Sequence, residues 1–312
     1  MAKKMRALTS SDYWAKREAD NLARNQLTEQ EYERRVNDIL KYMEDQITKE
    51  INGFYAKYAK AEGITMAEAK QRVSQLDIAE YERKAERYVR EKNFSAQANE
   101  EMRLYNATMK SNRLELLKAN IGLELVAGYD ELDKYMGQIL TERAREEIER
   151  QAGILGNAVE DLSQRAGEIA TASFNVATYS DRIWTHHAML KSELDNLLRE
   201  GMIQGRNPRV LARHLDKRFG VSRSNAVRLM RTELARVQTE AQKESYERNG
   251  YEMYEYIAEP TACSICKALD KHTYSVKDMT VGENAPPMHP NCRCSTAAYM
   301  DRTEFEEWLR RQ

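Results

Sequence analysis

The sequence predicts a mainly α-helical protein, with a long-helix region over residues 1–180 and a small α+β domain over residues 181–312. Three observations lead to this prediction. The first proline is Pro208, so helices can run uninterrupted before it. Glu, Lys, Arg and Ala are abundant, whereas the chain has only 13 Gly and 5 Pro. All four cysteines lie close to the C-terminus, so we expect a loop stapled by cysteine and histidine in the second domain.

The first expected helices lie near the N-terminus. Ser10, Ser11 and Asp12 offer an N-cap, and Thr28 with Glu31 has the spacing of a capping box that would begin a second helix. Apolar residues then recur at intervals of three and four, which predicts one apolar stripe on a long helix ending near Gly63. The stripe comprises Tyr32, Val36, Leu40, Met43, Ile47, Ile51, Phe54 and Tyr58.

Further helices are expected along the rest of the first region. They have narrow apolar faces, which fits an extended bundle that buries more surface against partner chains. One expected helix begins near Thr65, and the others cover residues 78–92, 99–121, 130–151, 159–172 and 181–200.

Composition excludes several classes of protein. With 49 Lys+Arg against 50 Asp+Glu, bulk charge gives no argument for nucleic-acid binding. No apolar run reaches the roughly 18 residues of a membrane span, and the N-terminus lacks the apolar stretch of a secretory signal. Four cysteines in 312 residues do not make a disulfide scaffold.

A basic stretch over residues 205–248 resembles a helix-turn-helix. Asn207 and Pro208 would begin its first helix, residues 219–222 would form the turn, and the second helix would stop at Gly250. Between Arg206 and Arg248 the chain has eleven basic residues and five acidic ones. The second helix is long for a recognition helix and its charges are interleaved, which favours a solvated face; DNA binding is therefore the alternative function.

The strongest local pattern follows a Tyr-rich segment, residues 251–260, that predicts a β-strand. Cys263 and Cys266 form C-x-x-C, and His289, Cys292 and Cys294 form H-x-x-C-x-C beyond a polar loop. Closely spaced thiolates and imidazoles are the ligands of tetrahedral structural Zn²⁺. Four of these five residues would fill the shell, and the surplus one is either His289 or one of Cys292 and Cys294.

Other interpretations of the cluster stay open at this point. Disulfides could join its two halves, or the thiols could be reduced packing residues. A redox C-x-x-C would need a βαβ context, which the sequence does not predict. No residue marks an open metal position or a general base, and no acid–base constellation includes the remaining histidines, so we expect neither an enzyme nor a small-molecule substrate. These histidines are His186, His187, His214 and His272.

Several short motifs together resemble a known family. They are Arg231-Thr232-Glu233 on a helix leading to a Gly, the C-x-x-C, Leu269-Asp270, and the segment PPMHPNCRC, which contains Pro286, Pro287, His289, Pro290, Cys292, Arg293 and Cys294. On these motifs, residues 185–297 resemble the head morphogenesis (Mu F-like) domain of tailed-bacteriophage minor capsid proteins. One departure is Lys271, where the family usually has Gly, so a turn with positive φ would have to be rebuilt there.

The resemblance implies a structural minor capsid protein that acts in phage head (procapsid) assembly. Its partners would be the portal protein, the scaffold or the major capsid protein, and it would be retained in the virion after assembly in the host cytoplasm. Non-specific contact with packaged DNA is compatible with this role. The motif residues would form an internal polar network or touch the partner, and for Arg231, Glu233 and Arg293 we favour the network. The motif set is Arg231, Glu233, Pro287, Pro290 and Arg293.

Overall fold

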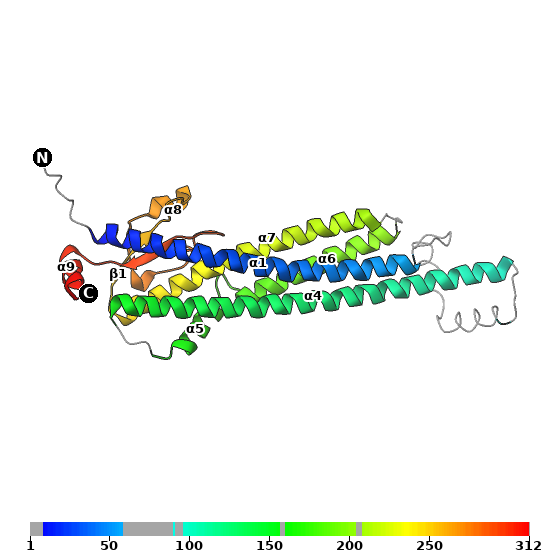
Figure 1. The fold of residues 1–312 in the computed structure, drawn as a ribbon, viewed down its shortest axis with the longest axis horizontal. Helices are drawn as coiled ribbons and strands as arrows, with labels where there is room; N and C mark the ends of the chain where they lie inside the picture. Colours follow the sequence, from blue (N-terminus) through cyan, green and yellow to red (C-terminus); the bar gives the residue numbers. More distant parts are fainter. Residues whose placement is uncertain (1–8, 59–89, 91–95, 157–159, 204–207, 312) are drawn as a thin grey trace. The chain divides into compact units, whose positions relative to one another are not determined.

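The computed structural model describes residues 9–58, 90, 96–156, 160–203 and 208–311 (Figure 1). It confirms the predicted fold class, because long helices fill the first part of the chain and a small sheet with short helices follows. The expected helices near Thr65 and over 78–92, the stop at Gly63 and the cap at Asn207 lie outside these residues. The long helices are α1 (Ser10–Tyr58), α4 (Ala96–Leu155), α6 (Tyr179–Ile203) and α7 (Pro208–Arg248), and α5 (Leu162–Thr171) is short.

Helix α1 is longer than its local signals predicted. The expected boundary at Thr28 was wrong: its hydroxyl donates to the carbonyl of Asn25 at 2.9 Å inside a continuous helix. Threonine bonds back to the preceding turn in this way without ending a helix. At the N-terminus, the Thr9 hydroxyl accepts the Asp12 N–H at 3.1 Å, so Thr9 provides the cap that we expected from the next three residues.

Helices α4 and α7 also join segments that were expected to be separate. In α7 the helix continues through residues 219–222, so the predicted turn, and with it the helix-turn-helix, was wrong. A glycine inside a helix costs about 1 kcal/mol. Burial of the Phe219 ring, which is fully shielded, contributes about 1.5–3 kcal/mol and outweighs that cost.

The chain forms two compact units, each assembled from segments far apart in sequence. We call the first the cluster unit; it comprises residues 1–37, 132–183 and 223–312. The second, the helical unit, comprises residues 38–131 and 184–222. The expected sequence division at residue 180 stays a prediction.

The helical unit consists of segments of α1, α4, α6 and α7 that run alongside one another (Figure 1). Its core contains the predicted stripe of α1, since Leu40, Met43, Ile47 and Ile51 are buried. None of the described helices has the length and apolarity needed to cross a membrane. Aliphatic and aromatic residues from the other three helices also contribute to the core: Leu117, Ile121, Leu125, Leu190, Leu194, Leu198, Leu211, Leu215 and Phe219.

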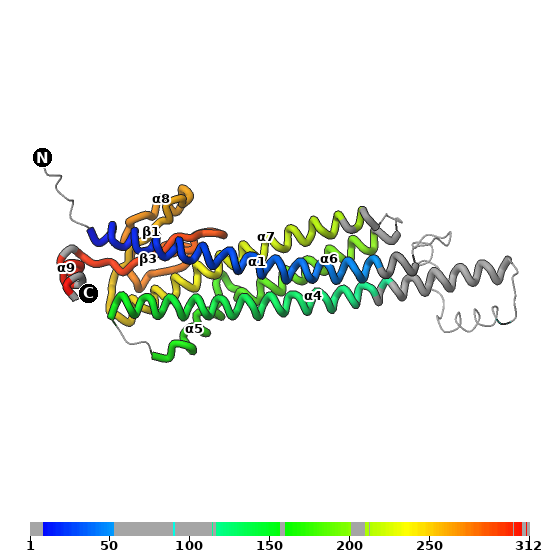
Figure 2. Tube along the Cα trace, viewed as in Figure 1, coloured from blue at the N-terminus to red at the C-terminus, as the bar shows by residue number. Residues whose placement is uncertain are grey.

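The cluster unit carries an antiparallel sheet of strand order β2-β1-β3. Its strands are β1 (Met253–Ile257), β2 (Thr273–Ser275) and β3 (Ser295–Ala298), and the tube in Figure 2 shows β1 beside β3. The strand predicted over residues 251–260 is thus confirmed as the central strand β1. Along the chain, helix α8 (Ser264–Leu269) joins β1 to β2, and the 3₁₀ turn η1 (Val276–Asp278) lies between β2 and β3. Helix α9 (Arg302–Arg311) follows β3.

Candidate metal centre: a cysteine and histidine cluster

Two segments of the cluster unit bring the predicted donors together. Cys263 is the N-cap residue of α8 and Cys266 lies within that helix. His289 and Cys292 lie in the loop between η1 and β3, and Cys294 directly precedes β3. The N–H of Cys292 donates to the carbonyl of His289 at 3.1 Å, which closes a tight turn through Asn291 at φ 64°. Asparagine tolerates this left-handed conformation better than most residues.

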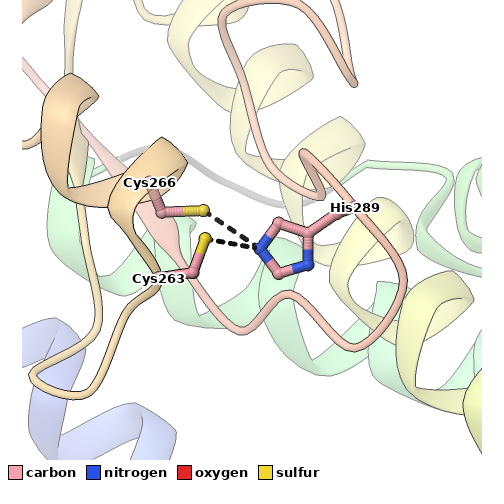
Figure 3. A group of neighbouring side chains, drawn as sticks. All are labelled: Cys263, Cys266 and His289. Carbon is pink, nitrogen blue, oxygen red and sulfur yellow. Dashed lines mark hydrogen bonds between the residues drawn. The ribbon is translucent and has the colours of Figure 1, made fainter.

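The donor atoms converge on Cys266. His289 Nε2 lies 3.2 Å from Cys263 Sγ and 3.4 Å from Cys266 Sγ, as Figure 3 shows. On its other side, Cys266 Sγ lies 3.8 Å from Cys292 Sγ. Donor atoms lie within 4.8 Å of one another in two overlapping sets, one with Cys263, Cys266 and His289 and one with Cys266, Cys292 and Cys294. The cluster could therefore hold a metal ion, and Cys266 belongs to both sets.

The surroundings set the proton affinity of each thiol. A hydrogen bond from the backbone N–H of Cys266 lowers the pKa of Cys263, which is exposed. Burial raises the pKa of Cys266 to about 12. The thiol of Cys294 donates to Cys292 and lowers the pKa of Cys292 to about 5, while the same bond and burial raise the pKa of Cys294. Two of the thiols therefore favour the thiolate form that metals bind.

The imidazole of His289 is oriented by its own loop. Its Nδ1 lies 2.9 Å from the carbonyl of Pro290, and this bond raises the pKa of the ring. An Nδ1–H that is fixed on a carbonyl leaves Nε2 free to coordinate, which is the usual arrangement of a histidine ligand. Pro287, which precedes the turn, is joined to Pro286 by a cis peptide bond.

The loop that carries His289 and Cys292 rests on the Arg231-Thr232-Glu233 motif of α7. The hydroxyl of Thr232 accepts the N–H of Asn291 at 3.2 Å. Arg231 pairs with Glu29 and Glu33 of α1, and Arg293 Nη2 reaches the same Glu29 at 2.8 Å. Glu29 thus joins the two motifs that are more than 50 residues apart, a role that no local sequence signal indicated.

Glu233, the third residue of the motif, is fully buried and pairs with Arg182 and Arg236. The guanidinium of Arg236 also donates to the carbonyls of Ile169 and Ala170, at 2.9 and 3.0 Å. These bonds satisfy a charged pair that would otherwise be costly to bury. Arg231, Glu233 and Arg293 therefore all make ion pairs within the cluster unit; contact of any motif residue with a partner stays a prediction.

A buried polar network behind β3 was not predicted from the sequence. The hydroxyl of Ser295, next to Cys294, donates to Glu18 of α1 at 2.7 Å, and Arg150 of α4 pairs with Glu18 at 2.7 Å. Gln242 of α7 donates to Ser295 and to Glu147, both at 2.9 Å. Burial raises the pKa of Glu18 against the opposing effect of Arg150. Three helices thus fix the strand at which the cysteine motif ends.

The turn at Lys271 keeps the positive φ that a glycine would adopt. Its φ is 64°, its N–H donates to the carbonyl of Tyr256 at 2.8 Å, and the Tyr256 N–H donates to the carbonyl of His272 at 2.9 Å. Asp270 accepts the N–H of Ala258 at 2.9 Å. The turn is therefore not rebuilt; lysine adopts the left-handed conformation at a conformational cost.

Together, these features define a helical protein whose terminal sheet and loops converge on a candidate metal centre. Residues 192–297 match the family described as Phage Mu protein F like protein. This segment is about a third of the chain and includes the Arg-Thr-Glu motif and all five donors, so the Mu F-like resemblance is confirmed there. No curated protein and no solved structure matches the chain.

Proposed function

We propose that this chain is a structural minor capsid protein that acts in phage head (procapsid) assembly and has no catalytic role. The observation that carries the proposal is the Mu F-like match over residues 192–297, because that family suggests a role in phage head morphogenesis. In this proposal the protein assembles with the portal protein, the scaffold or the major capsid protein in the host cytoplasm and stays in the virion.

We further propose that the cluster holds one structural Zn²⁺. The donor set fits, because thiolates and a neutral imidazole are the preferred zinc ligands, with Zn–S bonds of about 2.3 Å. Such bonds place two sulfurs of a tetrahedral shell about 3.8 Å apart, and Cys266 and Cys292 have a separation of 3.8 Å. Bound zinc would supply a cross-link between α8 and the loop before β3, which makes the small sheet rigid.

The helical unit offers the surface that we assign to partner binding. Leu123 and Val126 lie one turn apart on α4 and are exposed, and Met189 of α6 and Tyr42 of α1 also expose apolar side chains. Contiguous exposed apolar side chains mark protein contacts, and Leu123 and Val126 are the neighbouring pair to which we assign this contact. The contact would therefore be apolar and depend little on salt.

The predicted helix-turn-helix was the main argument for DNA binding by residues 205–248, and the continuous helix α7 removes this argument. Several of its basic residues are also engaged within the molecule: Arg231 and Arg236 in the pairs above, Arg248 with Glu244, and Lys243 with the carbonyl of Met279. Since phosphate-driven binding weakens steeply with salt, the salt dependence of any contact distinguishes this alternative.

The test is affinity capture of the tagged full chain from cells that produce the phage, with and without nuclease and at two salt concentrations. We expect portal, scaffold or major capsid protein to be enriched in all conditions. The double variant Leu123→Glu/Val126→Glu should lose this enrichment, whereas Glu124→Gln on the same helix should keep it. Recovery of DNA alone, abolished by nuclease or salt, would contradict the proposal.

A further inference from the structure

The side chain of Tyr256 ends in the cysteine cluster. This residue of β1 is fully buried and packs with Ala262, Cys266, Cys292 and Cys294. Among the described residues no oxygen or nitrogen atom accepts a hydrogen bond from its hydroxyl, which instead interacts with the thiols of Cys266 and Cys294. A neutral thiol is a weak hydrogen-bond acceptor and a thiolate is a strong one, so a hydroxyl that is buried beside these sulfurs is placed to donate to a charged sulfur.

Cys294 is a second buried residue in contact with the sulfurs of this cluster. It is buried directly before β3, whose first residue, Ser295, faces Ile257 at the end of β1. Its donor atom lies within 4.8 Å of those of Cys266 and Cys292, and neither Cys292 nor Cys294 belongs to the set that contains Cys263 and His289.

Cys292 is better placed than Cys294 to complete the set of Cys263, Cys266 and His289. Its sulfur lies 3.8 Å from that of Cys266. Its N–H is bonded to the carbonyl of His289, so the turn holds both residues in fixed relation. These contacts gather the thiols of Cys263 and Cys292 and the imidazole of His289 around Cys266.

We propose that Cys263, Cys266, His289 and Cys292 are the four ligands, and that Tyr256 and Cys294 form an outer layer whose O–H and S–H donate to the coordinated thiolates. This inference rests on the proposed metal site. Coordinated thiolates keep lone pairs that accept hydrogen bonds, and outer partners of this kind change metal affinity about 10–100-fold. The two outer residues would thus stabilise the bound ion without touching it.

The outer role of Tyr256 predicts that removal of its hydroxyl has different effects in the metal-free and the metal-bound protein. Without metal, Tyr256→Phe removes a hydroxyl whose contacts are the neutral thiols of Cys266 and Cys294, which are weak acceptors, so thermal stability should change little. With metal, the same change removes a donor to a thiolate, so zinc affinity should fall about 10-fold. A residue that serves only in packing would not give this combination.

The experiment uses the full chain, purified under reducing conditions and stripped with a chelator, for the wild type and four variants. Co²⁺ titration reports the number of thiolate ligands through the sulfur-to-metal charge-transfer band, and competition with a chromophoric chelator gives the zinc Kd. The variants are Tyr256→Phe, Cys294→Ala, Cys292→Ala and, as a control on the neighbouring strand, Tyr274→Phe.

We expect Cys294→Ala to keep the charge-transfer intensity of the wild type and Cys292→Ala to reduce it. Tyr256→Phe should keep the spectrum with a weaker zinc Kd, and Tyr274→Phe should match the wild type in both. If Cys294→Ala loses intensity while Cys292→Ala does not, the ligand assignment is wrong. An unchanged zinc Kd in Tyr256→Phe overturns the outer role of that residue. If the wild type binds neither metal, the proposed zinc site itself fails, and this inference with it.

Discussion

The helical unit and the sheet region that carries the cluster reach a defined structure by different means. The core of the helical unit is built from interchangeable aliphatic side chains on four helix segments, and Leu40, Leu125 and Leu198 are fully buried. The sheet region has strands of only five, three and four residues. Its loops depend instead on individual polar groups, such as Glu29, Thr232 and the cluster thiols.

This difference predicts how each region tolerates change. An apolar core loses stability in proportion to the volume that is removed, and nearby residues adjust in part. A small sheet that is pinned by specific atoms loses its local structure when one of these atoms is removed, even if the volume is unchanged. The two regions should therefore respond to different kinds of substitution.

The largest effect is expected for Cys263→Ser. Structural zinc contributes about 10–16 kcal/mol in small zinc-dependent folds, so loss of a ligand should unfold the sheet region while the long helices persist. Hydrogen exchange should show lost protection in residues 253–298, and far-UV circular dichroism should fall only slightly. Ser264→Ala, at the adjacent exposed position, is the control. Full retention of protection in Cys263→Ser would show that the cluster does not staple the region.

The matching change in the helical unit is Leu125→Ala, expected to lower the free energy of unfolding by about 2–5 kcal/mol because it leaves a cavity in a packed core. Urea denaturation measures this loss, and metal content should stay at the wild-type value. Leu123→Ala, two residues away and 70% exposed, should have almost no effect. Equal losses in the two variants would mean that this face assignment of α4 is incorrect.

An intermediate effect is expected for Glu29→Gln. The change removes the charge shared by Arg231 and Arg293, and a partly buried pair of this kind contributes about 1–3 kcal/mol. Urea denaturation should show this loss, and hydrogen exchange should locate it in the loop before β3. The neighbouring exposed change Glu31→Gln should be neutral. If Glu29→Gln behaves in the same way as Glu31→Gln, Glu29 does not hold the loop.

The sequence predicted the features that depend on local patterns better than those that depend on contacts between distant residues. A periodic pattern identified the apolar stripe of α1, and the content of Tyr and β-branched residues identified the strand β1, because both signals are local in the sequence. Helix ends were predicted less well. Thr28 carries a local start signal and residues 219–222 a local turn signal, yet α1 and α7 continue through them, and in α7 the burial of Phe219 outweighs the turn signal. The five donors followed from their spacing. Glu29 and Tyr256 did not, since their roles depend on residues distant in the chain.

A small stabilisation is expected for Lys271→Gly. Glycine adopts the observed φ of 64° without the steric cost that lysine bears, so the free energy of unfolding should rise by about 0.5–1 kcal/mol. The exposed Lys271–Asp12 pair at 3.9 Å contributes little against this gain. Thermal melting of the sheet region measures the change. Lys267→Gly, inside α8, should instead be destabilising, and a loss in both variants would mean that the turn does not require positive φ.

The smallest effect is a pH dependence located in the helical unit. Burial, aided by Lys191, lowers the pKa of His187, which packs against the rings of Tyr129 and Trp184. The unfolded state therefore binds more protons between the lowered pKa and about 6.5, so this unit should lose stability as pH falls through that window. His187→Phe should remove that part of the pH dependence in urea denaturation, and His214→Gln at an exposed position should not. Identical pH profiles for wild type and His187→Phe would contradict this assignment.

The central claim is that the sheet region is held by a metal on the cysteine and histidine cluster. It is tested most directly by measuring zinc content and reactive thiols on the full chain purified from a reduced lysate. The account predicts about one zinc per chain, with the ligand thiols protected until a chelator is added. No zinc and four thiols that react freely in the folded protein would contradict it.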